Sequence, residues 1–220
     1  MTGTAGLFIS IEGGEGSGKT TQCRTLVDYL EARGERALYV REPGGTLLGE
    51  RLREIVLFTR DLSLTPEAEA LLFSSARAQL TREVIAPALD LGTHVVADRF
   101  FDSTIVYQGY GAGADTEGLR FVTDFATGRL IPDLTFLLDL PVNVAMKRVH
   151  DRANGWDRIE SHDAAFHERV RDGYLALARG DRKRWIVLDG SRTQPDIAGS
   201  IAARIDEELE RRSHRIPTGR

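Results

Sequence analysis

The chain has 220 residues and a formal net charge of −4, which suit one α/β domain with a full core and argue against nucleic-acid binding as its main role. No apolar stretch approaches the ~20 residues of a membrane span, and no basic region precedes the first apolar run, so we expect neither a membrane segment nor a signal peptide. The single cysteine, Cys23, excludes an internal disulfide and fits a reducing cytoplasm.

Short apolar runs alternate with segments of helical periodicity along the whole chain. In chain order, the expected elements are a strand over 7–11, a helix over 20–33, a strand over 37–40, a helix over 47–58, a helix from Thr65 that Pro87 kinks or restarts, a strand over 94–98, a helix over 116–127, a strand over 134–138, a helix from Pro141, a helix over 161–179, a strand over 185–188 and a helix over 195–212. This alternation predicts a five-stranded parallel sheet with helices on both faces. We expect one domain over residues 1–212 and a polar tail over 213–220.

A glycine-rich loop joins the first strand to the first helix. Residues Gly13–Thr20 match the P-loop pattern G-x-x-x-x-G-K-[ST] at every fixed position. The glycines let backbone N–H groups point inward around phosphate oxygens, Lys19 reaches the β- and γ-phosphates, and the Thr20 hydroxyl can ligate Mg²⁺. A chance match is the alternative, which the flanking strand and helix argue against. The expected ATP-binding residues are Gly13, Gly14, Glu15, Gly16, Ser17, Gly18, Lys19, Thr20 and Thr21.

Polar residues follow the ends of other predicted strands. Arg41, Asp98 and Asp139 all do so, and ligands of parallel sheets bind at that edge, so we expect these residues to gather near Thr20. Asp98 ends an apolar strand as a Walker-B carboxylate does and can hold Mg²⁺ directly or through water. A helix cap or surface turn is the alternative reading of Asp98. Arg99 beside it can fork onto a phosphate.

Further motifs resemble those of the bacterial thymidylate kinases. After the P-loop they occur in the order Arg41-Glu42-Pro43-Gly44-Gly45-Thr46, Leu72-Phe73 with Arg77, Asp98-Arg99, Asp102-Ser103-Thr104 with Tyr107-Gln108-Gly109, and Asp157-Arg158-Ile159-Glu160. The resemblance runs from about Leu7 to the last helix. It implies a P-loop nucleoside monophosphate kinase fold, usually a cytoplasmic homodimer, that moves the γ-phosphoryl of ATP to dTMP with Mg²⁺ during dTTP synthesis.

The resemblance also implies an acceptor site. Phe73 would stack on thymine, although its spacing alone indicates a core residue, and Tyr107 would crowd a 2′-hydroxyl. Arg77 would reach a base carbonyl, and Glu15 would contact the sugar 3′-hydroxyl. The implied dTMP-binding residues are Glu15, Arg41, Glu42, Pro43, Arg53, Phe73, Arg77, Arg99, Ser103, Thr104, Tyr107 and Gln108. The expected metal ligands are Thr20, Asp98 and Glu42.

The source of the catalytic arginine separates branches of this family. Some members carry an arginine where this chain has Gly16, and the others supply it from a lid, here expected at about residues 150–160. Of the basic residues Lys147, Arg148, Arg152 and Arg158, we expect Arg152 and Arg158 to act beside Lys19 and Arg99. A solvated basic loop is the alternative. The nucleophile is an anionic phosphate oxygen, so no general base is required.

Two other functions are compatible with a P-loop. One is phosphorylation of a different small molecule, against which Phe73, Arg77, Tyr107 and Gln108 argue because together they suit a pyrimidine monophosphate. The other is a GTP-driven switch, which needs an N-K-x-D motif that the sequence lacks.

Overall fold

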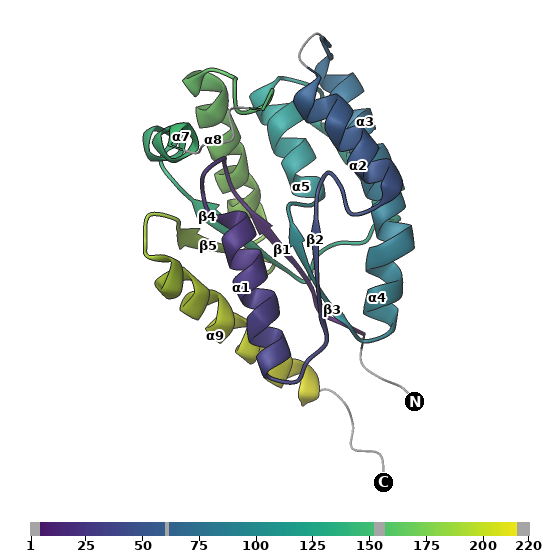
Figure 1. The fold of residues 1–220 in the computed structure, drawn as a ribbon, viewed down its shortest axis with the longest axis vertical. Coiled ribbons are helices and arrows are strands. Elements are labelled where there is room, and N and C mark those ends of the chain that lie inside the picture. Colours follow the sequence, from purple (N-terminus) through teal and green to yellow (C-terminus); the bar gives the residue numbers. More distant parts are fainter. Residues whose placement is uncertain (1–4, 60–61, 152–156, 215–220) are drawn as a thin grey trace.

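Five short strands form the parallel sheet at the centre of the molecule. The computed structural model describes residues 5–59, 62–151 and 157–214. The strands are β1 (Phe8–Glu12), β2 (Ala37–Arg41), β3 (His94–Asp98), β4 (Leu134–Asp139) and β5 (Trp185–Asp189). They lie in the order β2-β3-β1-β4-β5, and the prediction of a five-stranded parallel sheet is therefore confirmed (Figure 1).

Helices cover both faces of this sheet, and three stretches are π-helical (η). The helical elements are α1 (Lys19–Ala32), α2 (Leu47–Arg53), η1 (Glu54–Phe58), α3 (Pro66–Leu80), η2 (Thr81–Ile85), α4 (Ala86–Asp90), α5 (Phe101–Thr104), η3 (Ile105–Gly111), α6 (Thr116–Thr127), α7 (Val142–His150), α8 (Ala164–Gly180) and α9 (Gln194–Ser213). None of the helices among the described residues is long and apolar enough to cross a membrane.

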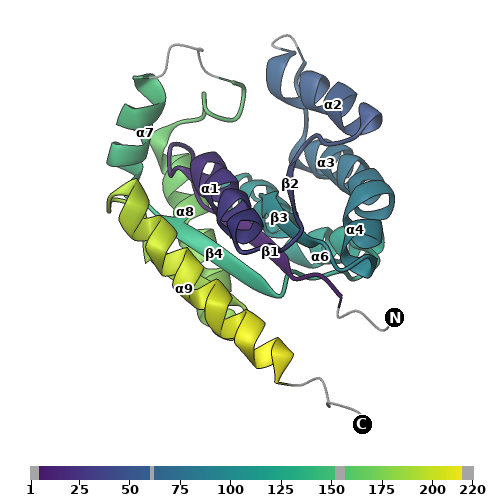
Figure 2. The same cartoon turned by 60° about the horizontal axis from the view of Figure 1, so that its bottom comes forward.

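Alternate side chains of β1 enter two different cores. Ile9 and Ile11 pack with residues of α1 and α9 on one face, where Figure 2 shows α9 running along β4 beside α1. Phe8 points to the other face and packs with Leu80, Ile85 and Leu89 from α3, η2 and α4. Burial on both faces explains why the strands are continuous apolar runs.

Local sequence signals fix several helix ends. The Thr65 side chain accepts a hydrogen bond from the Ala68 N–H, as expected of a helix cap. Gly128 ends α6 with φ of 62°, a left-handed conformation that suits glycine. The predicted strand over 94–98 and helix over 116–127 have the observed bounds.

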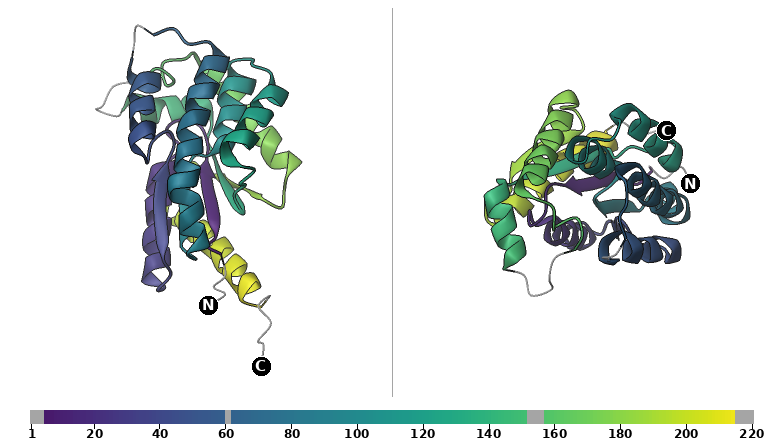
Figure 3. Two further views of the ribbon diagram at one scale, coloured as in Figure 1. Left: turned by 90° about the vertical axis from the view of Figure 1, so that its right-hand side faces the viewer. Right: turned by 90° about the horizontal axis from the view of Figure 1, so that it is seen from above.

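The structure differs from the prediction between Phe101 and Gly111, where no element was expected and the chain is helical. Valine, isoleucine, tyrosine and glycine in this stretch have weak helix propensity, which burial against α8 overrides. The chain from Pro66 to Asp90 is also helical throughout, because a π-helical turn, η2, joins α3 to α4, whose first turn contains Pro87. Figure 3 shows this long helical stretch running beside the sheet.

Candidate active site

The P-loop is pressed between the sheet and α7. Gly13 and Gly16 have φ of 144° and 69°, values that residues with a Cβ rarely adopt. A Cβ on Gly13 would lie 2.7 Å from the Leu138 carbonyl oxygen, and one on Gly16 would lie 2.7 Å from the Ala145 carbonyl oxygen. Both positions therefore need glycine for their backbone conformation and for space.

The invariant positions of the P-loop motif lie where the sequence predicts them. Lys19 is buried, and its Nζ donates to the Gly14 carbonyl oxygen at 2.8 Å. Burial and the nearby Arg99 cation lower the pKa of Lys19. Thr20 Oγ1 donates to Asp98 Oδ2 at 2.5 Å, so two of the three expected metal ligands are in contact. An anion entering the loop would give Lys19 a better partner than a carbonyl oxygen.

The oxygen donors at this point fit a magnesium ion held together with a nucleotide. Among the described residues no group of three or more His, Cys, Asp and Glu side chains could hold a metal by itself. Mg²⁺ in such sites uses one or two protein oxygens and completes its shell with phosphates and water. Thr20 and Asp98 supply such oxygens. Glu42 binds Arg77 through Oε2 at 2.7 Å, while its Oε1 is buried without a partner in the described part of the chain.

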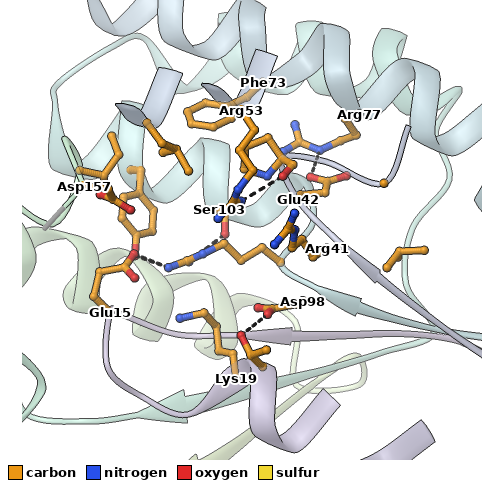
Figure 4. Close-up of a pocket in the computed structure, with 18 of the residues that line it drawn as sticks. Glu15, Lys19, Arg41, Glu42, Arg53, Phe73, Arg77, Asp98, Ser103 and Asp157 are labelled. Atoms are coloured by element: carbon orange, nitrogen blue, oxygen red, sulfur yellow. Dashed lines mark hydrogen bonds and ion pairs between the residues drawn. The ribbon is translucent and has the colours of Figure 1, made fainter. Parts of the chain in front are cut away.

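A cavity of about 790 Å³ extends from the P-loop to α3. Figure 4 shows Lys19 and Asp98 on the P-loop side and Phe73 and Arg77 on the opposite side. The predicted residues that line it are Glu15, Gly16, Gly18, Lys19, Thr20, Thr21, Arg41, Glu42, Pro43, Arg53, Phe73, Arg77, Asp98, Arg99, Ser103, Thr104, Tyr107 and Gln108. One hollow thus brings together nearly all residues expected at the two nucleotides.

Arg99 connects the P-loop to η3 and α8. Its NH1 donates to the Gly13 carbonyl oxygen at 3.1 Å and to Tyr174 OH at 3.0 Å. Its NH2 donates to Glu15 Oε1 at 2.5 Å and to Tyr107 OH at 2.9 Å. Arg99 also has φ of 72°, which is unusual for a residue with a side chain. These contacts hold the strained backbone in place and orient the guanidinium at the cavity wall.

Charge in this cluster is balanced between Glu15 and Arg99. Burial alone would raise the pKa of Glu15, but the Arg99 and Lys19 cations outweigh it and lower the pKa to about 2. Burial likewise opposes the charge of Arg99, and the Glu15 carboxylate is the main group that raises its pKa well above the usual value. Glu15 therefore carries a negative charge next to the loop that is expected to hold phosphates. Because Arg99 already neutralises that charge, an acid can be accommodated in a phosphate-binding loop.

The end of the cavity opposite the P-loop is built on α3. Phe73 and Arg77 lie one turn apart, as their spacing predicts. Arg77 is 2% exposed, and besides Glu42 it donates to Thr104 Oγ1 at 3.1 Å. Phe73 is partly buried, packs against the core beside α8 and lines the cavity. Both readings of Phe73, as a core residue and as part of the cavity wall, are thus compatible with its position.

The expected arginines after α7 do not all face the cavity. The Arg158 guanidinium forms an ion pair with Glu69, and its Nε donates to the Val56 carbonyl oxygen at 2.8 Å. Arg152 lies outside the described residues. Arg148 does line the cavity, and its NH1 donates to the carbonyl oxygens of Gly190 at 3.2 Å and of Gly16 at 3.4 Å. The catalytic roles of Arg152 and Arg158 stay predictions, and Arg148 becomes the described arginine of this segment nearest to the P-loop backbone.

Sequence reasoning missed a buried acid at the end of β1. Glu12 accepts hydrogen bonds from the Phe100 N–H at 2.7 Å, Ser103 Oγ at 2.7 Å and Tyr174 OH at 2.9 Å. Burial and then the nearby Asp102 raise the pKa of Glu12 to about 7. A charged residue closing the apolar run of β1 was a signal for this role. No local pattern marks Tyr174, which lies 162 residues away.

The fold and this cavity define a class of protein. A P-loop after the first strand of a five-stranded parallel sheet, facing arginines across one hollow, is the arrangement of a P-loop kinase of the nucleoside monophosphate kinase type. A family model described as thymidylate kinase matches residues 11–201. The chain therefore belongs to the thymidylate kinase family.

Individual relatives agree with this assignment. The thymidylate kinase of Desulfovibrio desulfuricans is 46% identical over 94% of this chain and 98% of that protein. The thymidylate kinase of Methylococcus capsulatus is 48% identical over 94% and 98%. A crystal structure of the thymidylate kinase of Ehrlichia chaffeensis is 34% identical and superposes with a TM-score of 0.69 over 84% of this chain and 93% of that one. Similarity thus extends over nearly the full length of each relative.

Proposed function

We propose that the protein transfers the γ-phosphoryl group of ATP to dTMP, giving dTDP and ADP in the synthesis of dTTP. The observation that carries this proposal is the shared cavity, which places the P-loop lysine, Lys19, and the α3 pair of Phe73 and Arg77 on opposite sides of one hollow in a chain of the thymidylate kinase family. Phosphoryl transfer needs such a shared space, because donor and acceptor oxygens must lie in line.

The proposed mechanism uses the residues of the chain for alignment and for charge. The acceptor oxygen is already anionic, so no side chain has to remove a proton. Lys19 and Arg99 supply positive charge at the cavity wall. Stabilising the charge that develops on the transferring group is usually the largest contribution of a protein to the rate. Thr20 and Asp98 would hold a Mg²⁺ ion, which when bound neutralises charge on the donor phosphates.

Arg99 has to exchange partners when the acceptor binds. Its NH2 now binds Glu15 and Tyr107, and a phosphate group beside Arg99 would compete for the same N–H donors. Arg53, whose NH1 donates to the Pro43 carbonyl oxygen at 3.0 Å, lines the same cavity and is the second arginine proposed for the acceptor phosphate. Glu15 would then be free to accept from the sugar 3′-hydroxyl.

A steady-state assay with ATP and a panel of nucleoside monophosphates tests the proposal. We expect turnover with dTMP, slower turnover with dUMP, and little with dCMP or dGMP. The Lys19→Ala variant should keep the circular dichroism spectrum of the wild type and lose phosphoryl transfer, because the lysine charge stabilises the γ-phosphoryl group in the transition state. A wild-type protein that leaves dTMP unphosphorylated, or that only hydrolyses GTP, would refute the proposed function.

We also propose that one kinase domain over residues 1–212 works in the cytoplasm as a homodimer. Phe121 and Phe125 lie one turn apart on α6 and are 76% and 80% exposed, and α6 packs against α3, where Leu71 is 55% exposed. Exposed apolar side chains on two helices that pack together suit a contact between two copies. Light scattering should give twice the chain mass for the wild type and the chain mass for Phe121→Asp; a monomeric wild type would contradict the dimer.

A further inference from the structure

A buried glutamate on α3 connects the part of the cavity beside Phe73 to the segment after α7. Glu69 is 6% exposed and lies one helical turn before Phe73. Its Oε2 accepts a hydrogen bond from Gln108 Nε2 at 2.9 Å, and its Oε1 forms an ion pair with Arg158. Arg158 is fixed in turn by the Val56 carbonyl oxygen. Both oxygens of the Glu69 carboxylate are therefore engaged by donors from other elements.

This contact decides which way the Gln108 amide faces. A glutamine side chain has two donors on Nε2 and an acceptor on Oε1, and either end can face a given partner. The Glu69 carboxylate, which is also paired with the Arg158 guanidinium, can only accept hydrogen bonds. It therefore selects the NH₂ end of the Gln108 amide as its partner. Gln108 is 2% exposed and lines the cavity, and no donor in the described part of the chain reaches its Oε1. The carbonyl end of Gln108 is thus left to accept from a ligand.

The acceptor on Gln108 complements the donors on Arg77. Both residues line the cavity with Phe73, and the Arg77 guanidinium can only donate. The thymine edge offers a carbonyl oxygen at position 4 and an N–H donor at position 3, which match a donor followed by an acceptor. Cytosine offers an amino group at position 4 and an acceptor nitrogen at position 3. It would be mismatched at both points, and leaving buried polar groups unpaired is costly.

We propose that Glu69 is a specificity-determining positioning residue: by fixing the amide of Gln108, it makes the acceptor site select a pyrimidine with an N3–H over cytosine. This inference rests on the proposed function, because it takes the base of the acceptor to lie beside Phe73. Glu69 itself does not touch the nucleotide in this scheme. Its effect on the choice of base passes through Gln108, whereas its ion pair with Arg158 bears on both substrates alike.

The Glu69→Gln variant tests the inference. A glutamine at position 69 can donate as well as accept, so the Gln108 amide is free to turn over. We expect the ratio of kcat/KM for dTMP to that for dCMP to fall at least about tenfold, while Glu67→Gln, a change at an exposed position on the same helix, keeps the wild-type ratio. In a Gln108→Ala background the Glu69 change should no longer alter the ratio, because coupled residues are not additive.

Two outcomes separate this inference from its alternatives. A parallel loss of activity on dTMP and dCMP in Glu69→Gln, with the ratio unchanged, would mean that Glu69 only supports the fold and would overturn the inference. A wild-type protein without dTMP turnover would instead refute the proposed function.

A measurement on the wild type covers the case in which the variant does not fold. The chain has four glutamines, so side-chain amide signals in ¹⁵N-glutamine-labelled protein can be assigned with Gln108→Ala. The Gln108 NH₂ protons should stay protected from exchange when dTMP binds, because they remain on Glu69. Loss of that protection on dTMP binding would show that the NH₂ group has turned to the base, against the inference.

Discussion

Close packing of the P-loop on α7 makes Gly16 the position at which a single methyl group is most informative. The Gly16→Ala variant adds a Cβ that would lie 2.7 Å from the Ala145 carbonyl oxygen and 3.3 Å from Arg148 Cβ and Val149 Cγ2. Because one of these neighbours is helix backbone, it cannot move without shifting α7. The same residue has φ of 69°, where a Cβ is strained even in open space.

Two other glycines of the loop separate these effects. Gly18 has φ of 94°, yet a Cβ there would meet nothing within 4 Å. Gly18→Ala should therefore lower the free energy of unfolding only by the strain of the left-handed conformation, about 1–2 kcal/mol. Gly14 has neither a close neighbour nor a positive φ, so the free energy of unfolding of Gly14→Ala should stay within about 0.5 kcal/mol of the wild-type value. In Gly16→Ala, overpacking of about 1–3 kcal/mol adds to the same strain, so the free energy of unfolding should fall by about 2–5 kcal/mol in total.

Thermal unfolding of the three variants without nucleotide measures the difference. For a chain of this size each kcal/mol shifts Tm by about 2–4 °C, so Gly16→Ala should melt roughly 2–12 °C below Gly18→Ala. Circular dichroism at matched protein concentration suffices, because the comparison is between variants of one loop. Equal melting temperatures for Gly16→Ala and Gly18→Ala would refute the argument that α7 packs against Gly16.

Four further predictions concern the cavity and the residues around it. Phe73→Ala should weaken dTMP binding by about 1–3 kcal/mol with ATP binding kept; titration with unchanged dTMP affinity and a less stable protein would return Phe73 to the core. Tyr107→Ala should relax rejection of ribonucleotides while Tyr107→Phe keeps it, and equal selectivity in both would remove that role. Because burial raises the pKa of Glu12 from 4.5 to about 7, its stabilising contribution is complete below about pH 4.5 and is lost as pH rises through about 7. The free energy of unfolding in urea should therefore depend less on pH in Glu12→Gln than in the wild type. An unchanged slope would exclude Glu12 as the titrating group. Arg148→Ala and Arg158→Ala, made separately, should show by kcat which arginine meets the transferring phosphoryl, with at least one falling steeply at little change in KM; normal turnover in both would leave Arg152, Lys19 and Arg99 to supply the charge.

The local sequence was sufficient for much of the fold. The strand over 94–98 and the helix over 116–127 were predicted with their observed bounds, because apolar runs, a helical period and a closing glycine are all short-range signals. The P-loop was equally local, since eight consecutive residues carry its phosphate-binding chemistry. The roles at the acceptor side came from resemblance to a family, because the spacing of Phe73 and Arg77 alone indicates no more than a shared helix face.

Contacts between distant segments were decided only in the tertiary structure. Tyr174 reaches Glu12 across 162 residues, and Gln108 reaches Glu69 across 39. The stretch from Phe101 to Gly111 is helical against its own propensity because α8 buries it. The direction of Arg158, toward Glu69, likewise depends on a partner from α3. A local pattern determines which backbone conformation a segment favours, but the partner of a buried charge is set by the chain that folds against it.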